Sequence, residues 1–405
     1  MTDLGFSQAR LQRIDRHLSA NYIETGKLAG AQVTVFRRGH VAHQASLGMA
    51  DAERKRRLED DAIFRIYSMT KPITSIAFMM LVEEGKIALD DPVARYIPEW
   101  KDIGVFVAGS HDAGWITRPP AQPMRIIDLL RHTSGLTYGF QQRGNIDAAY
   151  RRLETESFNR EGGIDQLIKD LAKVPLLFSP GESWNYSVST DVIGYLVGKL
   201  SDRPLDEVLK DRIFDPLEMV DTGFFVPPEK AHRLAACYEM TPKGPALFDD
   251  PTTSPFLRPP KLLSGGGGLV STSADYLRFS RMLLNGGELD GERLISPKTL
   301  KLMTANHIPG GKDLTEASVS LFSEGTYSGV GFGLGFATTI DQPRTLIPGS
   351  NGDFFWGGMA STFFWVDPLE ELTCVFMTQL MPSSTYTVRR EVRTLVYGAM
   401  TDTSG

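Results

Sequence analysis

Segments with the alternating apolar pattern of β-strands lie near both ends of this chain. The pattern covers residues 31–36 and 41–47, and it returns in an aromatic-rich stretch between residues 330 and 380. The intervening residues, from 71 to about 260, are richer in helical patterns and are interrupted by Pro- and Gly-rich segments. This distribution predicts one sheet that draws its strands from both ends of the chain, with a mainly helical region inserted between them.

Helical patterns accompany the strand segments at both ends. They cover residues 7–24, 273–285, 297–304 and 386–400. We therefore expect residues 1–70 and 265–405 to form an α/β sheet domain, and residues 71–264 to form an inserted, mainly helical domain.

The size and charge of the chain narrow its function. With 405 residues, 41% of them hydrophobic, the chain is long enough to bury a large core. Its formal net charge of −6 disfavours binding to a phosphate backbone, so we expect no nucleic acid partner. No apolar run reaches the ~18 residues of a membrane span, and the N-terminus lacks a basic flank before an apolar core. We expect no membrane span and a cytoplasmic location; export through a removed signal is the alternative.

We expect neither a metal nor a cofactor, and no disulfide is supported. The seven histidines show no H-E-x-x-H pattern and no cysteine at the spacing of zinc ligands; His132, after an apolar helical segment, is expected to be structural. Cys374 lies in an apolar strand-like run and is expected to be buried, whereas Cys237 is expected to be partly exposed. G-x-S-x-G is absent, which argues against an α/β-hydrolase nucleophile elbow.

The segment Ser68-Met69-Thr70-Lys71 places a hydroxyl and an amine one helical turn apart. Residues three apart share a face of a helix, so the Lys71 amine can reach the Ser68 oxygen and accept its proton when neutral. An apolar stripe follows, and Gly85 supplies a stop signal for the helix. The segment therefore predicts an activated serine nucleophile at the start of a helix.

Two further motifs are candidates for the same site. Tyr186-Ser187-Val188 follows a Pro-Gly turn and precedes an apolar helical run. Trp356-Gly357-Gly358 lies within an aromatic strand, where two glycines reduce strand stability. This second pattern predicts that a ligand or another backbone segment comes very close to the strand.

Taken in order, these segments resemble the serine β-lactamase and penicillin-binding-protein superfamily, and most closely its class C-like carboxylesterases, the family VIII esterases. The resemblance covers nearly the whole chain. Besides the three motifs, it rests on Leu89-Asp90-Asp91-Pro92-Val93, Leu129-Leu130-Arg131-His132-Thr133-Ser134-Gly135-Leu136 and Gly265-Gly266-Gly267-Gly268-Leu269-Val270-Ser271-Thr272. It implies a β-lactamase/transpeptidase-like α/β (α+β) sandwich, with an antiparallel sheet flanked by helices and an inserted mainly helical region. It also implies an active site in the cleft between the sheet domain, 1–70 and 265–405, and the inserted domain, 71–264.

The resemblance also implies roles for individual residues. Ser68 would be the nucleophile, and Lys71 and Tyr186 would share one mobile proton. The backbone N–H groups of Ser68 and Met359 would form the oxyanion hole.

The sequence differs from the lactamase pattern at two motifs that bind substrate in lactamases. Val188 stands where lactamases have the Asn of Tyr-x-Asn, and Trp356-Gly357-Gly358 stands in place of Lys-Thr-Gly. We assign Val188, Trp356, Gly357 and Gly358 to the substrate-binding set and expect neutral, fairly apolar acyl groups.

The expected function is hydrolysis of a small-molecule carboxylic ester through an acyl-serine intermediate. The alternatives are an acyltransferase, a β-lactamase or D-amino-acid peptidase using the same site, and a catalytically silent penicillin-binding sensor.

Overall fold

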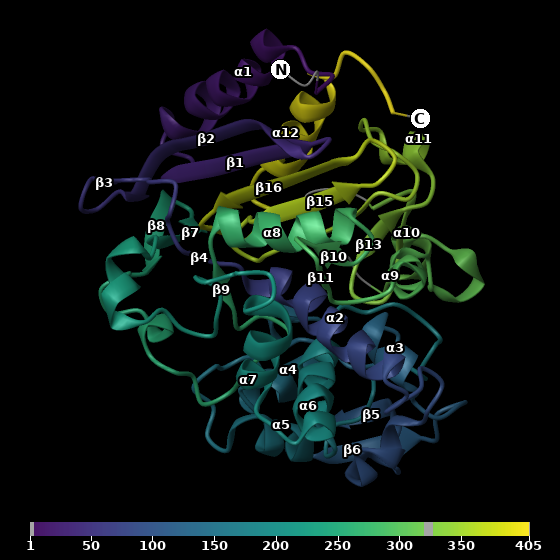
Figure 1. The fold of residues 1–405 in the computed structure, drawn as a ribbon. Helices are drawn as coiled ribbons and strands as arrows, with labels where there is room; N and C mark the ends of the chain where they lie inside the picture. Colours follow the sequence, from purple (N-terminus) through teal and green to yellow (C-terminus); the bar gives the residue numbers. More distant parts are fainter. Residues whose placement is uncertain (1–3, 320–326, 405) are drawn as a thin grey trace.

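The computed structural model describes residues 4–319 and 327–404 and is organised around one eight-stranded sheet (Figure 1). The strand order is β12-β13-β14-β15-β16-β1-β2-β3, and every neighbouring pair is antiparallel. The bounds are β1 Gly30–Arg37, β2 His40–Asp51, β3 Arg56–Arg57, β12 Val330–Phe332, β13 Ala337–Thr339, β14 Phe354–Gly357, β15 Phe363–Asp367 and β16 Leu372–Thr378.

Strands from the two ends of the chain meet in the middle of this sheet. β1 pairs with β16 in a register that sets Val33 opposite Phe376, so the predicted joining of the two ends is confirmed. All eight residues of β1 are buried, which fits a central strand covered on both faces. A tight turn at Arg38 and Gly39, both with positive φ, connects β1 to β2.

Helices cover both faces of the sheet. α1 (Gln8–Leu18) and α12 (Val388–Tyr397) lie together on one face, and α8 (Ser273–Leu284) lies against β15, β16 and β1 on the other (Figure 1). Each helix turns an apolar stripe toward the sheet, for example Tyr276 and Phe279 of α8. The layered antiparallel architecture expected from the sequence is therefore confirmed.

The inserted region is built around α2 (Thr70–Glu83) and α6 (Ser189–Ser201), which pack against each other. α2 is buried from Thr70 to Leu81, and Gly85 with a positive φ follows its end. The smaller helices around them are α3 Ile126–Leu130, α4 Asn145–Arg152, α5 Gly163–Leu171 and α7 Leu205–Leu209. Further helices near the sheet are α9 Pro297–Thr304, α10 Leu314–Ala317 and α11 Gln342–Thr345.

The two chain crossings between the sheet and the inserted region lie side by side. β4 (Phe64–Arg65) pairs with β9 (Val270–Ser271) just before α2 and α8 begin. We therefore propose the domain division at residues 70 and 265, with the two crossings held together by this short ladder.

Periodicity alone did not predict several strand pairs outside the main sheet, and two of them lie within residues 71–264. β5 (Val105–Ser110) pairs with β6 (Gly114–Arg118), and β7 (Cys237–Thr241) pairs with β8 (Gly244–Asp249) and with β17 (Leu380–Met381). β5, β6 and β8 are largely exposed, so they lack the buried, regular alternation that marks a strand in sequence. A last small pair joins β10 (Glu288–Leu289) to β11 (Glu292–Arg293).

The two cysteines and the N-terminal helix can be compared directly with the sequence-based expectations. Cys237 is fully buried in β7, so the expected partial exposure was wrong; Cys374 is buried in β16, and both thiols are free. The expected helix over residues 7–24 is α1 followed by a π-helical turn at Ser19–Ile23. Across the described residues, none of the helices combines the length and the apolar character needed to span a bilayer.

Candidate active site

Ser68 lies in a 3₁₀ turn, Tyr67–Met69, that leads directly into α2. Tyr67 has a φ of 42°, which is uncommon for a residue with a side chain. Ser68 lines a cavity of about 1040 Å³ whose walls come from both the inserted region and the sheet. The serine of the S-x-x-K segment therefore faces open space rather than capping a helix within the core.

Lys71 is fully buried beside Ser68. Its Nζ donates hydrogen bonds to Ser68 Oγ at 3.3 Å, to Tyr138 Oη at 2.9 Å and to the Gly266 carbonyl at 2.7 Å. Burial lowers the pKa of Lys71 to about 7, and the nearby Asp191 carboxylate offsets part of that effect. A large fraction of this amine is therefore neutral near pH 7 and has a lone pair available to accept a proton.

Tyr186 approaches Ser68 from another side, from the turn before α6. Its hydroxyl is hydrogen-bonded with the Ser68 hydroxyl and accepts a hydrogen bond from Trp356 Nε1 at 3.2 Å. Burial raises the pKa of Tyr186 well above its usual value, while both hydrogen bonds act in the opposite direction. Lys71 Nζ lies over the face of the Tyr186 ring, 4.5 Å from its centroid. Ser68 thus contacts an amine and a phenol at once.

The end of β14 forms the sheet side of the site. Trp356 and Gly357 end the strand, and Gly358 and Met359 follow in a turn; all four line the cavity with Ser68. A Cβ at Gly358 would lie 2.4 Å from the backbone oxygen of Ile66, two residues before the serine. The close backbone approach expected from the paired glycines is therefore present at Gly358.

Gly357 faces a movable side chain, whereas Gly358 faces backbone. A Cβ at Gly357 would lie 2.8 Å from the guanidinium of Arg389, at the end of a flexible side chain. That guanidinium donates hydrogen bonds to the carbonyls of Gly358 and Thr362 and thereby stabilises the turn.

Val188 is the predicted site residue that the structure does not bring to the cavity. Its side chain is fully buried at the position before α6, and it is absent from the described residues that line the space around Ser68. The described residues that line this space include ten aromatic ones: Tyr67, Tyr138, Phe140, Phe158, Trp184, Tyr186, Phe248, Phe256, Tyr327 and Trp356.

Tyr138 and Asp191 were missed by the sequence reasoning. Tyr138 reaches Lys71 across 67 positions of sequence, and Asp191 accepts hydrogen bonds from Ser264 and from the Gly266 backbone. Neither lies in a motif with a recognisable spacing; Asp191 lies five residues after Tyr186 and three after Val188, the last residue of that motif. The glycine run at 265–268 was the available signal, because a Cβ at Gly266 would lie 2.5 Å from Asp191 Oδ2.

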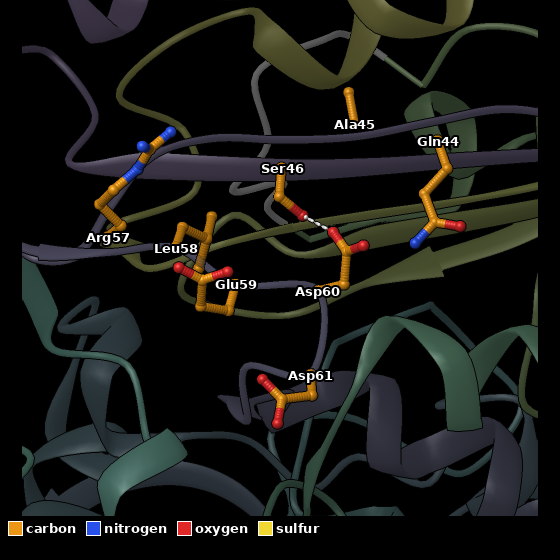
Figure 2. A pocket seen from close by; sticks show the side chains of 8 residues that line it. All are labelled: Gln44, Ala45, Ser46, Arg57, Leu58, Glu59, Asp60 and Asp61. Atoms are coloured by element: carbon orange, nitrogen blue, oxygen red, sulfur yellow. Dashed lines mark hydrogen bonds between the residues drawn. The ribbon is translucent and has the colours of Figure 1, made fainter.

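A second hollow lies away from this site, on the surface of β2 and the segment that follows it. It has a volume of about 640 Å³ and is lined by residues 44–46 and 57–61. Figure 2 shows its acidic side chains and the hydrogen bond of 2.6 Å from Ser46 to Asp60. Within residues 4–319 and 327–404, no group of three or more His, Cys, Asp or Glu side chains is arranged to hold a metal ion.

Comparison with known proteins agrees with this geometry. The model of the β-lactamase family matches residues 13–398, so the chain belongs to that family. An uncharacterised protein of Mycobacterium tuberculosis is 37% identical over 364 residues, covering 89% of this chain and 88% of that protein. Esterase EstB of Burkholderia gladioli is 29% identical over 370 residues, covering 87% of this chain and 86% of the esterase.

A solved structure shares the whole fold. EstCE1, described as a hydrolase with promiscuous acyltransferase activity, superimposes with a TM-score of 0.80 at 27% identity, covering 96% of this chain and 98% of its own. With the family match, these similarities place the chain among the serine hydrolases of the β-lactamase and penicillin-binding-protein superfamily.

Proposed function

We propose that this protein is a carboxylesterase that works through a covalent acyl-enzyme on Ser68. One observation carries the proposal: the Ser68 hydroxyl lies between a buried amine with a pKa near 7 and a buried phenol, at the wall of an aromatic cavity. This arrangement fits an activated serine nucleophile. The similarity to esterase EstB supports the same reaction.

In the proposed reaction, Ser68 Oγ attacks the ester carbonyl while its proton passes to the neutral Lys71 amine. The Lys71 and Tyr186 pair then donates a proton to the departing alcohol. Water attacks the acyl-serine in the second half; the same pair accepts the proton of the water and returns it to Ser68 Oγ as the carboxylic acid leaves. The backbone N–H groups of Ser68 and Met359 are the proposed donors to the oxyanion, since both residues line the cavity.

The cavity supports a neutral, apolar substrate. Among the residues that the structure describes, the five charged ones in its wall already bond to the protein: Arg143 with Asn185, Glu156 with Gly139, Asp191 with Ser264, Asp249 with Arg65, and Arg389 with backbone carbonyls. A substrate carboxylate would compete with these partners. The volume of about 1040 Å³ is slightly above the ~300–1,000 Å³ range typical of ligand pockets, so the cavity has room for a bulky apolar group.

A turnover screen tests this proposal. We expect p-nitrophenyl esters of graded chain length to be hydrolysed with higher kcat/KM than nitrocefin or a D-amino-acid amide. Higher kcat/KM on nitrocefin or on the amide would replace the esterase assignment with a β-lactamase or a peptidase. Acylation without turnover of any compound would identify a silent penicillin-binding sensor.

The nucleophile is tested separately by labelling. Intact-protein mass spectrometry should show a fluorophosphonate adduct on the native protein and none on Ser68→Ala. A Ser68→Ala protein that is still labelled, or that keeps most of its activity, would overturn the assignment of Ser68.

Acyl transfer is a second candidate, supported by the description of EstCE1 and by a cavity with room for an alcohol beside the acyl group. Adding benzyl alcohol to a p-nitrophenyl ester reaction should divert part of the acyl group into a benzyl ester, measured by chromatography. Complete hydrolysis at high alcohol concentration would exclude this candidate.

A further inference from the structure

Lys71 Nζ donates hydrogen bonds to Ser68, Gly266 and Tyr138, and Tyr138 is the one of these three that lies outside the sequence motifs of the site. We propose that Tyr138 is a positioning residue whose hydroxyl holds Lys71 Nζ so that the lone pair of the neutral amine points at Ser68. This inference rests on the proposed function, because it assigns Tyr138 to the activation of the Ser68 nucleophile.

The charge state of Lys71 determines how many hydrogen bonds Nζ can donate. A charged ammonium has three N–H donors, and the Gly266 carbonyl, Tyr138 Oη and Ser68 Oγ occupy three directions around Nζ. After deprotonation the amine has two donors and one lone pair. The carbonyl can only accept, so one donor remains directed to Gly266. The other donor and the lone pair are divided between Tyr138 and Ser68.

The hydroxyl of Tyr138 determines this division. When it accepts the remaining N–H, the lone pair is left for the Ser68 proton, which is the productive arrangement. When it donates to Nζ instead, the amine can only donate to Ser68 and cannot act as its base. A phenol can adopt either orientation, whereas a phenylalanine at this position would leave Nζ free to rotate about its last bond.

Tyr138 is held firmly enough for this role. Its side chain is buried, its ring stacks on Phe140 at 4.8 Å between centroids, and it contacts the Tyr186 ring at 5.3 Å. Burial raises its pKa well above the usual value, so the phenol stays protonated across the working pH range. A Cβ at Gly266 would come within 3.1 Å of Tyr138 Oη, so the glycine also keeps this contact open.

Other titratable groups around the amine affect its charge. The Asp191 carboxylate favours the charged form of Lys71. Asp191 also holds Gly266 in place, because its side chain accepts a hydrogen bond of 3.1 Å from the Gly266 backbone N–H. His132, beside Tyr186, has a pKa lowered well below its usual value by burial and by Lys71, so it stays neutral. The Glu156 carboxylate contributes to the raised pKa of Tyr138, and Asp191 contributes to the raised pKa of Glu156. These groups are unchanged in Tyr138→Phe, which isolates the contribution of one hydroxyl.

The test compares Tyr138→Phe with Tyr238→Phe in the full-length protein, with p-nitrophenyl butyrate as substrate from pH 5.5 to 9. Tyr238 is also a buried tyrosine; its hydroxyl accepts a hydrogen bond of 2.8 Å from the Ala52 backbone, away from the cavity. We expect Tyr138→Phe to lower kcat by roughly 10- to 100-fold, because a small misplacement of a catalytic group has effects of that size. Tyr238→Phe should stay within about twofold of the native rate.

The pH at which kcat/KM falls on the acid side distinguishes a positioning role of Tyr138 from a packing defect in Tyr138→Phe. The lost hydroxyl bonded more strongly to the ammonium than to the neutral amine, so its removal should lower the pKa of Lys71. The limb should therefore move to lower pH by roughly half to one unit. A variant with unchanged kcat, or with a reduced kcat and an unmoved limb, would overturn the proposal.

A fluorinated tyrosine at position 138 and the rate of fluorophosphonate inactivation provide two further tests of the role of Tyr138. If Tyr138→Phe folds poorly, 3,5-difluorotyrosine at position 138 preserves the shape of the ring while weakening its oxygen as an acceptor, and the limb should shift in the same direction. The rate of inactivation by a fluorophosphonate reports on Ser68 without any ester. If that rate follows the expected shift while no ester is turned over, the positioning role stands and the esterase proposal fails.

Discussion

The two sides of Ser68 supply different kinds of groups. The helical side presents titratable side chains: the Lys71 amine, the Tyr138 hydroxyl and the Tyr186 hydroxyl, all buried. The sheet side presents a strand end with two glycines, an indole and the backbone of the turn at Met359. The pKa values of the helical side are set by burial, whereas the geometry of the sheet side is set by how closely Gly358 approaches Ile66.

This difference indicates how each side contributes to the proposed reaction. Proton transfer depends on side chains with adjusted pKa values, so it is sensitive to substitutions that keep size but change chemistry. Stabilisation of an oxyanion depends on where backbone N–H groups point, so it is sensitive to substitutions that add volume. The predictions below test the two sides separately.

The largest effect is expected on the helical side, for Lys71→Arg. A guanidinium keeps the positive charge but stays protonated throughout the working range, so it cannot accept the Ser68 proton. We expect kcat to fall by about 10³-fold or more, within the range of general acid–base contributions. Steady-state kinetics at pH 8 would measure it, with the exposed Lys199→Arg as the matched control. Near-native kcat for Lys71→Arg would show that Lys71 only supports Ser68 electrostatically.

On the sheet side, Gly358→Ala should lower kcat by roughly 10²–10³-fold, the cost of losing one oxyanion donor. The new Cβ would lie 2.4 Å from the Ile66 backbone oxygen, so the turn that includes Met359 must move away from Ser68. Gly357→Ala should cost less, because it meets the movable end of Arg389. Gly144→Ala, with open space around its Cβ, is the control for adding a methyl group. Equal activity of the variants at 357 and 358 would contradict the steric argument.

The next substitution, Tyr186→Phe, lies on the helical side. This substitution removes the Tyr186 hydroxyl that is hydrogen-bonded with Ser68. We expect kcat to fall by about 10²-fold, because the remaining Lys71 amine still accepts the serine proton while the leaving alcohol loses a donor. The loss should be smaller for p-nitrophenyl esters than for alkyl esters, since p-nitrophenolate leaves without a proton. A comparison of the two ester classes in one assay measures this difference. An equal loss for both would indicate that Tyr186 acts on Ser68 rather than on the leaving group.

Much of the sheet was predictable from the sequence because its strands carry a regular pattern of buried residues. Residues 31–36 were expected to be extended, and β1 covers Gly30–Arg37. The helix over residues 297–304 has the expected bounds, because Ser296 caps it and Pro297 begins it. The exposed hairpin β5–β6 was not predicted, because its residues face solvent and carry little periodicity.

The candidate site was predictable only where its residues lie within one helical turn or one short motif. Ser68 and Lys71 are three residues apart, so helix geometry alone brings their polar atoms together. Tyr138 contacts the same amine and Asp191 acts on it electrostatically, and both are brought there by tertiary packing, which no local pattern encodes. Val188 was assigned to substrate binding from its place in a motif, yet its side chain, at the position before α6, is buried in the core.

The smallest effect is expected for Trp356→Phe, where the two sides of the site meet. This substitution keeps an aromatic ring near Phe332 and Tyr186 but removes the indole N–H that donates to Tyr186 Oη at 3.2 Å. A neutral hydrogen bond contributes about 1 kcal/mol, so kcat should fall by only about fivefold. The lost donor favoured the ionised phenol, so the pKa of Tyr186 should rise and any basic limb in the kcat profile should move to higher pH. A reduced kcat with an unchanged pH profile would instead assign Trp356 to the cavity wall alone, and the sheet side would then act on the substrate without influencing the proton-handling groups of the helical side.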